Sequence, residues 1–278
     1  MRRLAAVFAL ALALGVHARA QYVSEDYDFA LYLIDNDLKA DAKALLGTRS
    51  YMPSDTLTFL KAWTHYQLKE LEEASSLFRA VPVESPFHEK SLFYSAAVSA
   101  HLGDFTSPVA ELEAYGGPFG ELRSLQLAGL ALLRGDKDAY LQASQAFRFE
   151  DFALQEAEHQ LEDIFNYRYE QKPKSPWLAA AASALVPGLG KIYAGQTGEG
   201  VSAFLVTGAF GAITAEHWIK DGLSDWKTIV PGLLFATLYL GNIYGSYMSV
   251  SIYNTKIRDA QDTAVLYNIH IPLRAVFK

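Results

Sequence analysis

Two long stretches without charge in the last third of the chain most constrain what it can fold into. Residues 228–253 contain no Asp, Glu, Lys or Arg, and neither do residues 200–215. A helix needs roughly 20 apolar residues to cross a bilayer. The sequence therefore predicts a hairpin of two spanning helices, one at about 228–253 and one at about 200–219 if the second run extends to Ile219.

A third uncharged run lies just before this hairpin and is shorter. It covers residues 177–190, contains Pro187, and follows a linker at 171–176 with two prolines and two lysines. Its length predicts a short interfacial or re-entrant helix, so that residues 177–253 form one membrane module. A third membrane crossing is the alternative.

Small residues recur every four positions in the longest run. They are Thr237, Gly241, Gly245 and Ser249, and the preceding run carries Gly208 and Gly211 among others. Such stripes let membrane helices approach closely where no hydrophobic force drives them together. We expect this stripe to pack the helices of the hairpin.

A glycine-rich motif begins at the end of the short run 177–190 and continues past it. Its letters, PGLGKIYAG, do not fit a phosphate-binding loop, because Ile192 follows the lysine where Ser or Thr is needed. The pattern Pro-Gly-x-Gly-x-x-Tyr-x-Gly resembles the signature of the TM-two family, small bacterial two-helix membrane modules with no established activity. The matching residues are Pro187, Gly188, Gly190, Tyr193, Gly195 and Gly200, while Lys191 stands where these modules usually carry Gln. We expect the glycines to form a tight turn, with Tyr193 at the level of the lipid headgroups.

The N-terminus has the pattern of an export signal. Arg2 and Arg3 precede the apolar run 4–16, and an Ala-x-Ala sequence ends at Ala20. This predicts a signal peptide over residues 1–20 that is removed after export. An uncleaved anchor is the alternative.

Between residues 21 and 170 the hydrophobic period is helical and small residues recur at regular distances. Four alanines follow one another at steps of 32, 34 and 32 residues: Ala30, Ala62, Ala96 and Ala128. Polar turns such as Arg134–Lys137 lie at equivalent places after them. This spacing predicts a repeat of antiparallel helix pairs, in which the alanines allow the helices to approach closely.

The repeat resembles the tetratricopeptide-repeat family, with its best match from Leu60 to Phe78. The resemblance implies stacked helix pairs with a concave groove for peptides or partner proteins, rather than catalysis. Pro108 and Tyr140 replace the second small residue of the third and fourth pairs, so we expect looser packing there. A fifth helix at about 151–167 would cap the array. The alternative is a repeat that positions the membrane part without binding a ligand.

The C-terminal tail, residues 254–278, ends in an alternating pattern. Apolar residues share one parity: Val265, Tyr267, Ile269, Ile271, Leu273, Ala275 and Phe277. This predicts a short strand, interrupted or confined to an edge by Pro272. We expect the repeat to fold without the tail, because stacked pairs stabilise one another. The alternative is that the tail packs on the repeat and completes it.

Catalysis and metal binding find little support in the sequence. His-Glu-x-x-His, Gly-x-Ser-x-Gly and calcium-loop motifs do not occur. Glu158, His159 and Glu162 could share a helix face, but a solvated acidic surface is the simpler interpretation. We therefore predict no catalytic residue, no cofactor and no metal ligand. The lack of cysteine excludes disulfides and thiolate zinc sites, and the formal charge of −7 argues against nucleic acid as a partner.

These features predict an all-α, non-enzymatic protein of the bacterial cell envelope. Its exported repeat domain would bind a protein or peptide, and its C-terminal hairpin would anchor it to the lipid of the inner membrane. The alternative is a component of a small oligomeric transporter or channel, although uncharged spans favour anchoring.

The predicted membrane topology conflicts with the distribution of lysines. With two crossings and an exported repeat, Lys220 and Lys227 face the cytoplasm, while Lys172 and Lys256 face outward against the positive-inside tendency. A third crossing would remove part of this conflict by moving the C-terminus to the inside.

Overall fold

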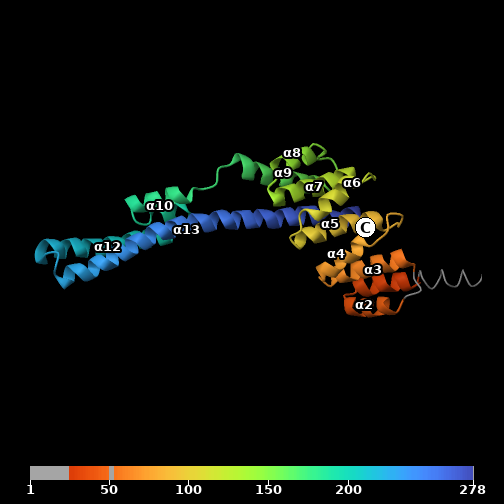
Figure 1. Cartoon of the computed structure of the whole chain (residues 1–278), viewed down its shortest axis with the longest axis horizontal. Coiled ribbons are helices and arrows are strands. Elements are labelled where there is room, and N and C mark those ends of the chain that lie inside the picture. The colour runs from red at the N-terminus through yellow and green to blue at the C-terminus, as the bar shows by residue number, and fades with distance from the viewer. Residues whose placement is uncertain (1–24, 50–52, 278) are drawn as a thin grey trace, which may run out of the picture. The chain divides into compact units, whose positions relative to one another are not determined.

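The computed structural model of the chain describes residues 25–49 and 53–277 (Figure 1). The predicted signal peptide, residues 1–20, lies outside these residues. Every regular element in the described part is a helix, so the all-α prediction is confirmed there. The described residues divide into two compact units, one of residues 166–263 and the other of the described residues up to 165 together with 264–277.

The first unit is built from consecutive helix pairs, in agreement with the predicted period. A helix over residues 25–35 pairs with α2, and three further pairs and a final helix, α9, follow it. Their bounds are α2 Lys39–Thr48, α3 Ser54–Gln67, α4 Leu71–Arg79, α5 His88–His101, α6 Ser107–Ala114, α7 Gly120–Arg134, α8 Lys137–Ser144 and α9 Gln155–Glu170.

The turn inside each pair has the same geometry in all four pairs. One residue in each turn has a positive φ, and these residues are Asp37, Lys69, Gly103 and Gly135, spaced as the four alanines are. The next amide then donates to the carbonyl five residues back, as Asp104 N does to Ser99 O at 2.9 Å. This bond closes the helix end by satisfying a carbonyl that would otherwise lack a partner. The repeat is therefore a repeat of conformation as well as of sequence.

The four repeated alanines lie in the core, with exposures of 2% or less. Their counterparts in the second helices are buried too, including Pro108 and Tyr140, which differ most from the pattern. Pro108 sits in the first turn of α6, where a missing N–H removes no helical hydrogen bond. Both of these second helices, α6 and α8, are 8 residues long, shorter than α2 and α4.

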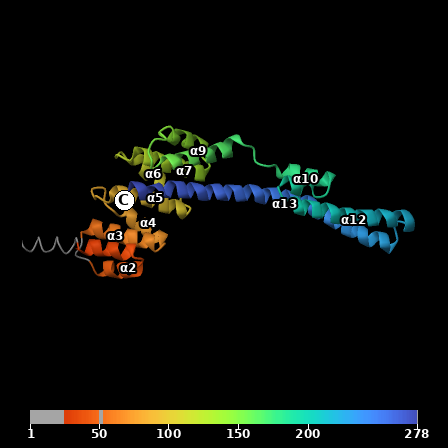
Figure 2. The same cartoon turned by 180° about the vertical axis from the view of Figure 1, so that it is seen from behind.

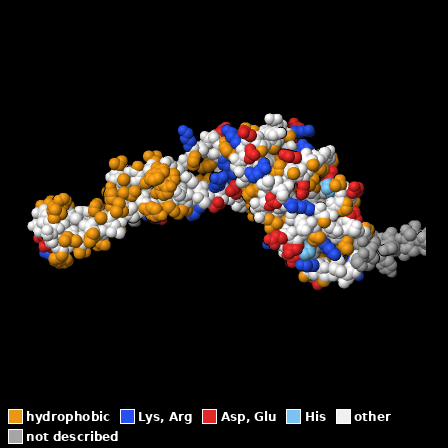
Figure 3. Space-filling view, viewed as in Figure 1, with side chains coloured by type: hydrophobic (Ala, Val, Ile, Leu, Met, Phe, Trp, Pro, Cys, Tyr) orange, Lys and Arg blue, Asp and Glu red, His pale blue; other side chains and the backbone are white. Residues whose placement is uncertain are grey.

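The second unit contains two helices long and apolar enough to cross a membrane. They are α12, Thr197–Asp221, and the first part of α13, Trp226–His270; shorter helices precede them, α10 over Pro176–Leu185 and α11 over Leu189–Tyr193. Both α10 and α12 lie beside α13 in two opposite views (Figures 1 and 2). In the space-filling view, hydrophobic side chains cover this unit, while acidic and basic ones gather over the helix pairs (Figure 3).

The tail is helical, so the prediction of a strand over its end is wrong. Helix α13 continues to His270, and α14 follows over Pro272–Val276 with its proline in the first turn. Three of the seven residues of the alternating set, Val265, Ile269 and Leu273, are buried at 1% exposure or less, whereas Tyr267 is 56% exposed. Side chains spaced by four residues share one face of a helix. An alternating pattern also includes residues spaced by four, so the same residues fit a helix as well as a strand.

Candidate functional site

The last helical residues occupy a face of the repeat made by the first helices of successive pairs. Ile269 packs directly on Gly129 of α7, where a Cβ atom would lie 2.1 Å from the Ile269 Cγ2 atom. Any larger residue at 129 would push the tail away. A glycine inside a helix costs about 1 kcal/mol relative to alanine, so its presence at 129 is the sequence signal that could indicate a close approach here.

A buried amide connects the tail to two helices of the repeat. The Nε2 atom of Gln126 donates to the carbonyl oxygen of Phe93, at 3.0 Å, and to that of Ile269, at 3.1 Å. Gln126 is fully buried. The Ile269 carbonyl lies in the last turn of α13, where carbonyls lack a helical partner, so the glutamine supplies a cap from α7. Sequence reasoning missed Gln126, because its role depends on an acceptor 143 residues away.

Aromatic and histidine side chains surround the end of α13. The Tyr66 hydroxyl and His270 Nε2 are hydrogen-bonded. The His270 ring lies 6.2 Å from that of Tyr94 and 5.3 Å from that of His101, both edge-on. Burial, and then the neighbouring His101 and Arg274, lower the pKa of His270 to about 4. Burial also lowers the pKa of His101. The site therefore holds its histidines neutral at pH 7.

Acid should loosen this contact. His270 binds a proton near pH 6.5 when unfolded but near 4 when folded, so the unfolded state binds more protons between these values and stability falls as pH decreases. We expect the loss to reach at most about 3 kcal/mol at pH 4. Thermal unfolding of the full chain in detergent, measured from pH 7 to 4, checks this.

A His270→Gln variant should show a flatter pH profile, because its side chain does not titrate. His88→Gln removes a histidine from another part of the repeat and should keep the profile of the original chain. Identical profiles for the two variants would contradict the assignment to His270.

The tail thus contacts the first helices of three successive pairs. Its partners are Tyr66 on α3, Phe93 and Tyr94 on α5, and Gln126 and Gly129 on α7. In both views, the blue end of α13 lies alongside α5 (Figures 1 and 2). This face of the repeat is therefore a binding surface for a helix, and the chain's own C-terminal segment fills it.

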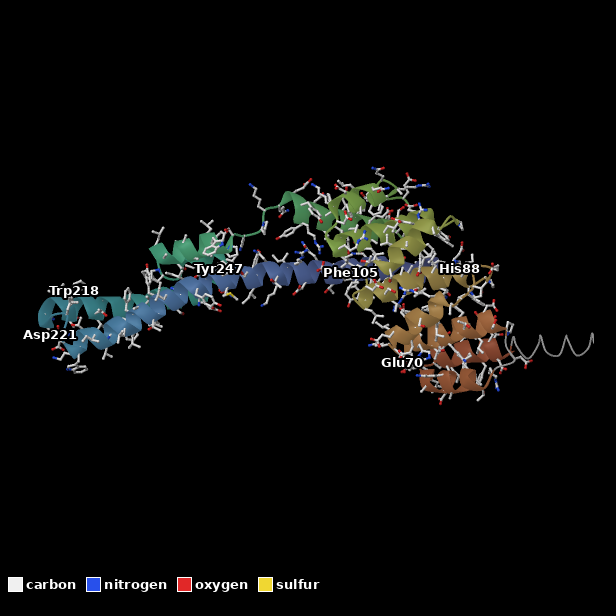
Figure 4. The ribbon with its side chains drawn as sticks, in the orientation of Figure 1. Glu70, His88, Phe105, Trp218, Asp221 and Tyr247 are labelled. Carbon is white, nitrogen blue, oxygen red and sulfur yellow. The ribbon has the colours of Figure 1, made fainter. Side chains whose placement is uncertain are left out.

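A second concave surface lies between α4, α5 and α6 and remains open. Its volume is about 900 Å³. Arg79 lines this surface. Its Nη2 atom donates to the hydroxyl groups of Ser99 and Ser107, and its Nε atom lies 3.5 Å from Glu111 Oε1. Val83 on its edge is 72% exposed. The surface thus offers charged groups of both signs beside an exposed apolar side chain. Figure 4 labels His88, which lines it at the start of α5.

The glycines of the Pro-Gly-x-Gly motif lie where backbones meet in the second unit. Gly188 has φ of +89°, and a Cβ atom there would lie 2.0 Å from the carbonyl oxygen of Gly200. A Cβ atom on Gly190 would lie 2.1 Å from the carbonyl oxygen of Ala179. Side chains cannot be accommodated at such distances from rigid backbone. These positions therefore join α10, α11 and α12 by direct backbone contact.

The other motif residues lie around the same turn. Pro187 lies in the turn between α10 and α11, and Gly195 has a positive φ of 95° with open space around it. Tyr193 ties this turn to the preceding linker: its hydroxyl accepts from Ser175 N at 3.2 Å, and its carbonyl accepts from Lys174 Nζ at 3.0 Å. The linker is thus fixed to the module.

The small-residue stripe faces outward over part of its length. Thr237 and Gly241 are exposed, and no described atom lies within 4 Å of where a Cβ on Gly241 would be. The close approach of α12 and α13 falls at Gly211, whose Cβ would lie 3.0 Å from the Phe235 ring. Ser249 is half-buried, and a Cβ atom on Gly245 would lie in contact with the Lys191 side chain. A packing role for the whole stripe stays a prediction.

One member of the acidic group on α9 is not solvated. Glu158 is fully buried, and its Oε2 atom accepts from Phe149 N at 2.8 Å. Burial raises the pKa of its carboxyl group, and nearby Glu121 adds to this effect. Phe149, with φ of 58°, folds over the start of α9 and stacks on His159. A positive φ at phenylalanine has no sequence signature, so this burial could not be predicted.

The remaining titratable residues form no group that could hold a metal ion within the described residues. No family model matches the sequence, and neither a curated protein nor a solved structure is significantly similar to it. What the chain does must therefore be inferred from its own geometry.

Proposed function

We propose that this chain is a non-enzymatic scaffold of the bacterial cell envelope. Its tetratricopeptide-like repeat domain would be exported and would bind a protein segment, and a module similar to the TM-two family would anchor it in the inner membrane. The observation that carries the proposal is the helix held across α3, α5 and α7. It supports a repeat whose surfaces recognise protein segments rather than transform a substrate.

The position of the tail also supports two membrane crossings. Residues 264–277 belong to the same compact unit as the repeat, so both must lie in one aqueous compartment. An even number of crossings between 166 and 263 satisfies this condition, and the two candidate helices supply it. The third uncharged run forms α10, which at 10 residues is about half the length a crossing requires.

Cysteine labelling tests this arrangement without background, because the chain has no cysteine. We expect Asp259→Cys and Glu72→Cys to react with a membrane-impermeant maleimide from the same side of sealed vesicles. Leu223→Cys, in the exposed turn between α12 and α13, should react from the opposite side. Labelling of positions 72 and 259 from opposite sides would exclude an even number of crossings.

The open surface between α4 and α6 is where we expect the partner, because the first-helix face is already filled. A photo-crosslinking amino acid replacing Val83, on the edge of that surface, should yield a defined adduct in intact cells. The matched control replaces Phe152, which is 92% exposed but lies in the loop before α9. Equal adducts at both positions, or none at 83, would contradict the proposed binding surface.

A further inference from the structure

A groove opens between α12 and α13 within the membrane module. Its volume is about 570 Å³, and its walls include Val206 and Leu238 with the stripe residues Thr237 and Gly241. It lies along the first residues of α12, whereas Trp218 and Asp221, labelled in Figure 4, mark the other end of that helix at the turn. The missing side chain at Gly241 leaves open space there.

A polar side chain in this groove lacks any partner. Asn242 lines the groove with 6% of its surface exposed, and neither its Nδ2 nor its Oδ1 atom is hydrogen-bonded within the described part of the chain. It lies in the uncharged run of α13. An unpaired amide shielded from water is destabilising, and a bilayer supplies no water to pair it. A ligand with an acceptor group would pair the Nδ2 atom, which is otherwise left without a hydrogen bond among the described residues.

The mouth of the groove carries one charge of each sign. Lys191 Nζ lies 3.4 Å from Glu199 Oε2, and the two side chains are 22% and 63% exposed. Because the pair has no net charge, it offers little general attraction to an anionic headgroup. It instead matches a headgroup with a phosphate for the lysine and an ammonium donor for the glutamate.

We propose that this groove binds one molecule of a phospholipid with a primary ammonium headgroup, such as phosphatidylethanolamine. An acyl chain lies along Val206 and Leu238, and the phosphate pairs with Lys191. The ammonium donates to Glu199, and a glycerol ester carbonyl accepts from Asn242. This inference rests on the proposed membrane anchoring and adds a defined lipid to it.

Native mass spectrometry of the full chain in detergent tests the proposal. The probes are phosphatidylethanolamine, phosphatidylcholine and phosphatidylglycerol with identical acyl chains, each titrated separately. We expect a single phosphatidylethanolamine to bind about tenfold more tightly than phosphatidylcholine, whose quaternary ammonium cannot donate a hydrogen bond. Glu199→Gln should remove that difference, because the glutamine carries no charge to pair with the ammonium.

Gly241→Leu fills the groove and should weaken binding by about tenfold or more. Gly208→Leu is the matched control, since Gly208 is equally free of neighbours but does not line the groove. Equal affinities for the three lipids, the tightest binding by phosphatidylglycerol, or the same loss in both leucine variants would overturn the proposal. So would a dimer that fills the groove with a second copy and excludes lipid. Failure of the membrane anchoring can be distinguished from failure of lipid binding. If the chain is not anchored, alkaline carbonate will release it from membranes.

Discussion

Replacing Ile269 with aspartate should unfold the repeat unit or detach its C-terminal helix. Ile269 is 1% exposed and packs on Gly129, where no space exists for a displaced or solvated carboxylate. Removing a buried isoleucine side chain costs about 2–5 kcal/mol, and burying an unpaired charge adds to this. The expected result is a loss of several kcal/mol, measured by chemical denaturation of the full chain in detergent.

The neighbouring Tyr267 supplies the control, because it lies on the same helix but is 56% exposed. Tyr267→Asp should change stability by about 0.5 kcal/mol or less, as surface substitutions usually do. A fragment of residues 21–170 gives a second readout. Because the tail packs on Gly129 and Gln126, we now expect the opposite of the sequence-based expectation: the fragment should aggregate or have low helicity until a peptide of residues 260–278 is added. A stable helical monomer without the peptide would show that the repeat does not need its tail.

The repeat could be predicted from the sequence because its signal is local. The alanines recur at steps of 32 and 34 residues, and each precedes its turn by seven positions. A turn with a positive φ can be predicted from the local sequence when glycine occupies that position, as at Gly103 and Gly135. At Asp37 and Lys69 the same conformation occurs without glycine, so the period rather than the residue type indicated those turns.

The tail could not be predicted in the same way, because its period was ambiguous. Seven apolar residues of one parity suit a strand, yet Val265, Ile269 and Leu273 alone suit a helix. The surface that selects the helix lies more than 100 residues away in the sequence. Gly129 leaves room for the helix there, and Gln126 caps its end. Tertiary contact overrides local pattern in such cases.

Valine at both Gly188 and Gly190 should prevent assembly of the module formed by residues 177–253. A Cβ atom at either position would lie about 2 Å from a backbone carbonyl oxygen. A change of side-chain rotamer cannot relieve this overlap, because it moves neither the Cβ atom nor the backbone oxygen. Gly188 also has a φ of +89°, which a β-branched residue resists strongly. We expect a loss of several kcal/mol. Thermal unfolding in detergent and resistance to protease measure it.

The matched control places valine at Gly198 and Gly208, two glycines of the same module with nothing within 4 Å of where a Cβ atom would lie. Both lie in α12, so the control introduces the same residue type within the same unit. If the control pair destabilises the module as much as the motif pair does, general intolerance of valine explains the effect. If the motif variant is instead as stable as the original chain, the backbone contacts at Gly188 and Gly190 do not hold the module together. A selective loss assigns the motif to the joining of α10, α11 and α12, and explains its glycines by the close backbone contacts there.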